Sequence, residues 1–276
     1  PYVNDELGSP RELIGTMNHL MRSDSTISST PAQGTLGSGW RVGLSVGYMV
    51  HPNLGFEMQY NYHKSNDIVM ARTISPTYEA EHIVYSTRME LIPQLVLSVD
   101  LGKRWGIWSK NGVILPVWGY VQSTIKIDDR EGRVFTDQTG IPSPNVTAKV
   151  NAKARTNPKF SYGFQTRLGV TFKATDRLSI YAEANYAALA IKAKETINEE
   201  FQIGFLDPTT GNAFSVSLDS LDMIDKQSTY VPELTENSNN PEYNQNVDRD
   251  RPLDEIDFKD NFNHLGVAVG IRFYLW

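Results

Sequence analysis

Apolar residues alternate with small or polar residues along several stretches of the chain. Between Gly39 and Val50 the even positions, from Trp40 onward, are all apolar, and the odd positions are mostly glycine, serine or arginine. Successive side chains of a β-strand point to opposite faces, so a period of two predicts a strand between two different environments. The same period predicts further strands at residues 54–64, 160–172, 178–192 and 265–276, with less regular ones at 83–99 and 113–127.

These seven predicted strands are unusually long. They run for about 11 to 17 residues, whereas strands of globular proteins average about 5 to 6. A tilted strand that crosses a bilayer needs about 9 to 11 residues. The lengths therefore favour strands that span a membrane.

Short and long connections alternate between the predicted strands. The short ones lie at residues 51–53, 100–112 and 174–177, and the long ones at 66–80, 128–158 and 195–260. Short turns at one end and long loops at the other are typical of an outer-membrane barrel with periplasmic turns and extracellular loops. We expect an N-terminal segment, residues 1–37, that is mostly extracellular loop, followed by a transmembrane barrel at residues 38–276.

The number of strands is odd, whereas bacterial single-chain barrels have an even number. The first and last predicted strands both run toward the short-turn end, so an antiparallel barrel needs one more strand before residue 39. We expect eight strands, the first of them upstream of Pro1, with Arg11–Met21 as the fallback. The predicted fold class is all-β, an antiparallel up-and-down transmembrane β-barrel.

Composition narrows the possible chemistry. The chain has no cysteine, which excludes disulfides, thiolate metal sites and thiol nucleophiles, and it has no apolar run of helix-spanning length. The formal net charge of -6 is the sum of -12 in residues 195–260 and +6 elsewhere. An acidic chain of this kind is not expected to bind nucleic acid.

The two faces of the strands predict two environments. The apolar face would meet outer-membrane lipid, and aromatic residues near the short turns would form an interfacial girdle, namely Tyr48, Phe56, Trp105, Trp108, Phe172, Phe273 and Trp276. The polar face would place a charge network in the lumen, namely Arg41, Glu57, Arg88, Glu90, Arg167, Glu183 and Arg272. Folding the strands about residues 174–177 brings Arg167 opposite Glu183 or Asn185. Paired charges predict a salt-bridge plug, and an ion or proton path is the alternative.

The strand pattern and the C-terminal run Gly270–Trp276 resemble the small OmpA/OmpX-like outer-membrane β-barrels, and in particular the outer-membrane β-barrel family common in Bacteroidota. The resemblance covers about residues 39–276. It implies insertion by the barrel-assembly machinery through a C-terminal signal at Phe273, Leu275 and Trp276. Here the alternate apolar residues are one position out of register with Trp276.

The sequence contains no strong catalytic motif. The five histidines form no metal-spaced pair, and His264 has no adjacent serine of the kind found in lipid A deacylases. Asp128 and Asp129 lie near a barrel mouth, where His82 or His264 could approach as in omptin-type proteases. The acidic segment 195–260 could hold calcium weakly, although solvated loop charge explains it more simply.

We therefore expect a non-enzymatic Gram-negative outer-membrane protein without a cofactor or catalytic residues. Its plugged lumen would leave the extracellular loops, or a wall docked to a larger outer-membrane complex, as the working surface. Its expected partners are lipid, lipopolysaccharide, the assembly machinery and such a complex, and its C-terminus would be periplasmic. A barrel enzyme acting on lipid A or peptides, and a narrow pore, remain as alternatives.

The predicted membrane barrel gives a first test. We expect the purified protein to require detergent and to migrate faster on a denaturing gel before heating than after it, because a closed barrel resists unfolding by the detergent until it is heated. A native protein that is freely soluble without detergent would contradict this fold.

Overall fold

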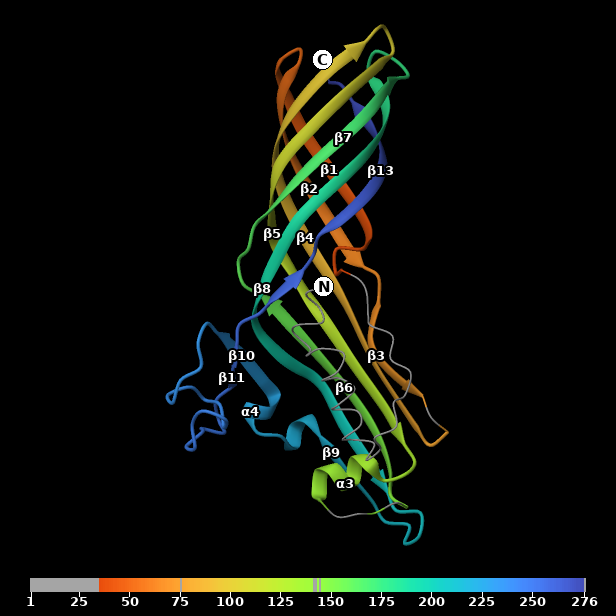
Figure 1. The fold of residues 1–276 in the computed structure, drawn as a ribbon. Coiled ribbons are helices and arrows are strands. Elements are labelled where there is room, and N and C mark those ends of the chain that lie inside the picture. Colours follow the sequence, from red (N-terminus) through yellow and green to blue (C-terminus); the bar gives the residue numbers. More distant parts are fainter. Residues whose placement is uncertain (1–34, 75, 141–142, 144, 276) are drawn as a thin grey trace.

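The computed structural model describes residues 35–74, 76–140, 143 and 145–275, and in these residues it is built almost entirely from β-strands (Figure 1). The strands form one 13-stranded sheet. All of its pairs are antiparallel except that of β10 with β11. The all-β, antiparallel class predicted from the alternation is therefore confirmed.

Seven long strands follow one another around the barrel. Each pairs with the next in chain order, and short turns join them at the end drawn uppermost in Figure 1. They are β1 (Gly39–His51), β2 (Leu54–Ser65), β4 (Tyr78–Leu101), β5 (Trp105–Asp129), β7 (Gly163–Lys173), β8 (Leu178–Leu206) and β13 (His264–Phe273). The connection expected at 100–112 is much shorter, because β5 begins at Trp105.

The segments expected to be long loops contain additional strands and helices. β4, β5 and β8 continue past the barrel and form an outer sheet with shorter strands (Figure 1). The additional elements are β3 (Ile68–Ile74), α3 (Arg133–Thr139), β6 (Thr147–Pro158), β9 (Ala213–Ser217), η1 (Leu218–Ser220), α4 (Met223–Lys226), β10 (Gln227–Val231), β11 (Leu253–Ile256) and β12 (Lys259–Asn261).

The alternation did not reveal the strands and helices within the long connections at 66–80, 128–158 and 195–260, and β6 shows the physical reason. Its inward positions are mostly alanine, such as Ala148, and its other face carries lysine and arginine. Lys153 lies 3.6 Å from carboxylates of both Glu199 and Glu200 on β8. Backbone pairing and small apolar side chains stabilise this strand. The alternation of hydrophobic and polar residues in its sequence is therefore weak.

The outer sheet has a hydrophobic core of its own. The residues buried there come from the outer parts of three strands, β4, β6 and β8, from α3 and from the chain before β6, namely Tyr78, Ala80, Val134, Val146, Ala148, Ile203 and Phe205. The ring of Phe135 on α3 lies edge-on to that of Phe205, with centroids 5.5 Å apart. Because α3 covers one face of the sheet, the outer half is packed as a folded unit.

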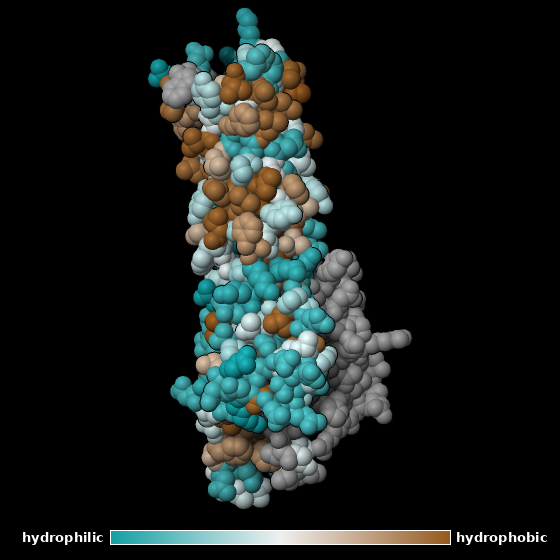
Figure 2. All heavy atoms as spheres, turned by 90° about the vertical axis from the view of Figure 1, so that its left-hand side faces the viewer, coloured by the Kyte–Doolittle hydropathy of each residue, from teal (hydrophilic) through white to brown (hydrophobic). Residues whose placement is uncertain are grey.

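The barrel wall exposes many apolar side chains. On the face shown in Figure 2, most hydrophobic residues lie over the barrel, and most residues over the outer half are hydrophilic. The outward side chains of the edge strands are among the most exposed, with Leu44 at 73% and Val267 at 88%. Aromatic residues lie toward both ends of this wall, with Tyr48, Phe56, Trp105 and Phe273 near the short turns, and Trp40, Trp118, Phe160 and Tyr162 near the outer half.

Trp108 does not belong to the girdle that the sequence predicted. It lies three residues after the outward Trp105, so it points inward and is only 4% exposed. The adjacent Gly169 makes room for it, because a Cβ there would lie 2.3 Å from the indole ring. Trp276, which we also expected in the girdle, lies outside the described residues.

The described strands do not pair all the way around the barrel. β1 pairs with β2 and β13 pairs with β8, and no pairing joins β1 to β13. The expected strand before residue 39, including the Arg11–Met21 fallback, lies outside the described residues. No helix among the described residues has the length and apolar character needed to span a bilayer.

The outer core gives a prediction for Phe205→Ala. Phe205 is 5% exposed and packs against two other rings, so its truncation should cost about 3 to 5 kcal/mol of local stability. We expect faster hydrogen exchange in α3, β6 and the outer part of β8, measured by mass spectrometry, with exchange in the barrel unchanged.

The matched control is Leu206→Ala, the next residue on β8, which is 46% exposed and points away from this core. It should leave exchange nearly unchanged. Equal acceleration throughout the barrel strands in Phe205→Ala would contradict an independently packed outer sheet.

Candidate functional site

The predicted charge network lies on the inward faces of the barrel strands. Arg88 and Glu90 on β4, Arg167 on β7 and Glu183 on β8 are each no more than 5% exposed. The other three predicted members, Arg41 on β1, Glu57 on β2 and Arg272 on β13, are partly buried. One inward face thus collects charges that are far apart in the sequence.

Three ion pairs organise this network. Arg88 Nε lies 2.6 Å from Glu90 Oε1, and Arg167 Nη1 lies 2.9 Å from Glu183 Oε1. The register places Arg167 beside Asn185, one of the two predicted neighbours, with the ion pair running diagonally. Both side chains of each pair are at most 2% exposed, so each charge depends on its partner for compensation.

The third pair includes a residue that the sequence analysis missed. Lys110 Nζ on β5 lies 2.7 Å from Glu57 Oε1. Lys110 fell in the predicted connection at 100–112, and it was therefore not included among the charges of the lumen. The alternation of Trp108, Lys110 and Gly112 with Ile107, Ser109 and Asn111 is the signal that would have placed it inside.

Glutamines and aromatic rings complete the inner surface. Gln94 Nε2 donates to Glu57 Oε1 at 2.8 Å, and Gln165 Oε1 accepts from both Arg167 Nη2 at 3.0 Å and Arg41 Nη1 at 3.3 Å. The ring of Trp108 lies 4.4 Å from Lys110 Nζ and 5.7 Å from the Arg272 guanidinium. Aromatic rings and amide oxygens therefore contact the cations of this layer in addition to the carboxylates.

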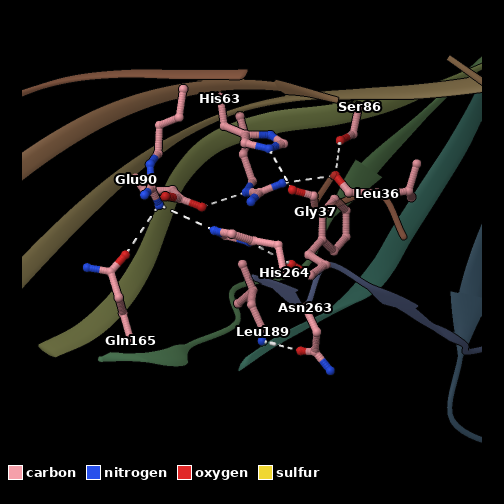
Figure 3. A network of polar contacts seen from close by, with 12 residues as sticks. Leu36, Gly37, His63, Ser86, Glu90, Gln165, Leu189, Asn263 and His264 are labelled. Atoms are coloured by element: carbon pink, nitrogen blue, oxygen red, sulfur yellow. Dashed lines mark hydrogen bonds and ion pairs between the residues drawn. The ribbon is translucent and has the colours of Figure 1, made fainter. Parts of the chain in front are cut away.

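The chain preceding β1 enters the outer end of this network (Figure 3). The Leu36 carbonyl accepts hydrogen bonds from Ser86 Oγ at 3.1 Å and from Arg88 Nη1 at 3.3 Å, and the Gly37 carbonyl is 3.0 Å from His63 Nε2. Leu36 also packs in a buried apolar cluster with Ile92, Ile114, Ala187, Leu189, Ile191 and Phe262. An apolar layer therefore lies directly beyond the charged layer.

The residues considered for catalysis do not come together. The carboxylate of Asp129 accepts hydrogen bonds from the backbone N–H groups of Glu131 and Val134 and so holds the start of α3, while Asp128 pairs with Arg130. His264 lies in the lumen, where its Nε2 is 3.4 Å from Arg41 Nη1. Among the described residues no hydrogen bond or ion pair joins either aspartate to a histidine.

His82 has a hydroxyl partner but no carboxylate partner among the described residues. Its Nε2 lies 2.7 Å from Ser123 Oγ in the outer sheet, and burial lowers the pKa of His82. A nucleophile of this type also needs a group that orients the histidine and donors for the oxyanion. Among the described residues no hydrogen bond or ion pair joins His82 to a carboxylate that could orient it.

The acidic segment forms a side lobe (residues 218–256) that is organised around a buried asparagine. Asn239, 2% exposed, donates from Nδ2 to the carbonyls of Asp248, Arg251 and Pro252, and its Oδ1 accepts from the Asp248 N–H. Among the described residues no group of three His, Cys, Asp or Glu side chains is arranged to hold a metal ion. The lobe is ordered by amide hydrogen bonds.

The lobe is attached to the outer sheet through β10. Lys159 Nζ donates to the Tyr230 carbonyl at 2.9 Å, and the Tyr230 hydroxyl is 2.9 Å from Thr196 Oγ1 on β8. Burial raises the pKa of Tyr230 to about 12, which keeps this hydroxyl protonated at neutral pH. The lobe therefore has a fixed position beside the outer part of β8 (Figure 1).

Two members of the predicted assembly signal are described. Phe273 is 71% exposed and Leu275 is 79% exposed, both at the short-turn end of the last strand. Trp276 lies outside the described residues. The alternation of outward apolar residues therefore continues to the end of the described chain.

Comparison with known proteins gives one match. A family model described as outer membrane protein beta-barrel domain matches residues 20–219. No curated protein and no solved structure gives a significant match.

The buried pairs give a prediction for Arg167 and Glu183. Replacing Arg167 alone with methionine leaves Glu183 buried without its partner, and should lower the free energy of unfolding by about 3 to 5 kcal/mol. The double variant with both residues changed to methionine should recover most of this loss. Urea unfolding in detergent micelles, followed by tryptophan fluorescence, measures both effects.

The matched control is Lys173→Met, which breaks the ion pair with Asp100 at the short-turn end, where the side chains are 36% and 66% exposed. That change should cost at most about 1 kcal/mol. If Arg167→Met costs no more than this control, the lumen is hydrated enough to solvate a single charge.

Proposed function

Because the chain belongs to the family of the outer membrane protein beta-barrel domain, we propose that it is a non-enzymatic outer-membrane barrel that acts through its outer half. Its lumen is plugged, and its short turns and C-terminus face the periplasm. The outer sheet and the side lobe face the cell exterior and bind a neighbouring component of the outer membrane.

The observation that carries this proposal is the continuation of three barrel strands into a separately packed outer sheet. β8 alone has 29 residues, against the about 9 to 11 that cross a bilayer. The additional length is covered by α3 and packed around Phe205, and the lobe is fixed by Tyr230 and Asn239. A folded and rigid projection is suited to present a defined surface, because little conformational entropy is lost on binding.

A plugged lumen is supported by the two layers inside the barrel. The charged layer contains three close ion pairs, and the apolar layer beyond it contains Leu36 and Phe262, which are 4% and 2% exposed. An eight-stranded barrel has an interior about wide enough for side chains to fill. We therefore expect purified protein in planar bilayers to give no steady ion conductance, which separates this proposal from a narrow pore.

The interaction role is tested through the lobe. A photo-crosslinking amino acid at Tyr243, which lies in the lobe and is 51% exposed, should give a discrete adduct with one outer-membrane component in intact cells. Asn239→Ala removes the buried amide that holds the lobe, and should reduce that adduct about tenfold, the effect of about 1.4 kcal/mol of lost binding energy.

Asn237→Ala is the matched control, because Asn237 is exposed in the same turn and its side chain makes no hydrogen bond to the described residues. It should leave the adduct unchanged. A second crosslinker at Phe160, which is 81% exposed on the barrel wall, tests docking through the wall. The absence of adducts at both positions would contradict an interaction role.

A further inference from the structure

The outward face of the barrel wall carries a small polar patch, formed by Ser109 and Asn111 on β5 and by Thr166 on β7. These residues alternate with buried inward neighbours such as Lys110 and Arg167, so they belong to the lipid-facing set. The backbone pairing of β5 with β7 sets Asn111 directly beside Thr166. The patch therefore occupies adjoining positions on two neighbouring strands.

The polar patch lies about halfway along the wall. Asn111 is six residues after the outward Trp105 and seven before Trp118, which lie near the two ends of the wall on β5. Thr166 is placed in the same way, with a phenylalanine six positions before it and another six positions after it. Because aromatic girdles mark the two membrane interfaces, the patch faces the hydrocarbon interior.

The patch interrupts a wall that is apolar elsewhere at this depth. Near the middle of the other described barrel strands the outward residues are Leu44, Met58, Leu95, Ala184 and Val269. A polar side chain that faces hydrocarbon has lost its hydrogen bonds to water, which is unfavourable unless another group replaces them. The patch is therefore better suited to a protein surface than to lipid tails.

Hydrogen bonds within the patch satisfy only part of its polar atoms. Thr166 Oγ1 donates to Asn111 Oδ1 at 2.8 Å, and Asn111 Nδ2 donates to Ser109 Oγ at 3.3 Å. A side-chain amide has two N–H donors and an oxygen with two lone pairs. Asn111 thus keeps one donor and one acceptor position that no described residue uses, and two such amides can pair with each other.

The surface around the patch is hollowed. Two neighbouring hollows of about 720 and 360 Å³ lie along β5, β7 and β8, and the patch residues are part of their lining. Small outward side chains of β8 also line them, namely Ala182, Ala184 and Ala188. Small residues let two membrane-embedded surfaces approach closely, and the larger Phe164 and Leu168 lie beside them.

The geometry of a membrane favours a second copy of the chain as the partner of this patch. Copies of one chain insert in the same orientation, so a two-fold axis that relates two neighbours runs along the membrane normal. Such an axis uses the same face of both copies and keeps every residue at its own depth. A mid-depth patch therefore meets the same patch, whereas an unrelated protein would need polar groups at that depth of its own.

We propose that the wall formed by β5, β7 and β8, which lie side by side (Figure 1), is the interface of a homodimer. Asn111 and Thr166 of each copy hydrogen-bond with the same residues of the other copy at its centre, and the alanines of β8 allow the two walls to meet. This inference needs only the membrane barrel, and it is independent of the partner proposed above for the outer half.

Crosslinking tests the interface in intact outer membranes. Because the chain has no cysteine, one introduced cysteine reports on one position. Phe164→Cys places a thiol beside the patch, where a short bis-maleimide should join two copies of the chain. Leu44→Cys is the matched control, since Leu44 is equally outward at a similar depth on β1, away from this face, and it should remain uncrosslinked.

The dimer should also depend on the polar atoms of the patch. Asn111→Leu and Thr166→Val together make the wall apolar, and should reduce the crosslinked fraction of Phe164→Cys about tenfold. The heat-dependent gel migration should not change, because both replaced side chains face outward. If the double variant does not fold, Thr166→Val alone, which keeps the shape of the side chain, should still reduce the crosslinked fraction.

Four results would overturn the proposal. Equal crosslinking at Leu44 and Phe164 would report random collision, and an adduct of Phe164→Cys with a different protein would identify another partner. The absence of any protein adduct at Phe164 would mean that lipid covers the patch. A dimer that persists unchanged without the polar atoms of Asn111 and Thr166 would mean that the patch does not hold the two copies together.

Discussion

The structure depends on one constraint, which is that a backbone in hydrocarbon must satisfy its hydrogen bonds within the protein. In this chain the constraint is met by long antiparallel strands that pair with their neighbours in sequence order. Since the wall is only one sheet thick, its outward face meets the lipid directly. The hydrophobic residues therefore lie outside, and the polar residues of each strand are directed into a narrow interior.

That inversion explains why the interior is built from charges. Alternation forces every second side chain inward, and a seven-strand arc leaves little space for water around them. The charges are accommodated as close pairs such as Arg88–Glu90 and Arg167–Glu183, with amides and rings around them. Such pairs add little net stability over apolar packing, but removing one partner is costly. Two of them also join different strands, because Arg167–Glu183 links β7 to β8 and Lys110–Glu57 links β5 to β2.

Outside the barrel the same strands pack as they would in a soluble globular protein, with apolar residues buried and polar residues exposed. The outer parts of β4, β5, β6 and β8 bury an apolar face under α3, and the lobe is fixed by a buried amide. Hydrophobic residues are buried in this half, and they lie on the surface of the other half (Figure 2). The two halves share strands but face different solvents, and the folded outer half is the part able to meet a partner in water.

The sequence by itself determined the parts that depend on local alternation. The seven strand positions, the apolar wall, the inward charges from Arg41 to Arg272 and the approach of Arg167 to Glu183 all follow from a period of two and a tight turn. The tertiary structure decided what depends on neighbours. β6 was hidden because its stabilising partners lie on β5 and β8, and Trp108 and Lys110 were misplaced because only the pairing of β5 with β4 places its start at Trp105. The sequence did not predict the lobe around Asn239 either, because its hydrogen bonds join residues that follow no regular spacing along the chain. The alternation of apolar and polar residues can be read from the sequence alone, whereas the pairing of strands that are distant in sequence is decided only in the folded structure.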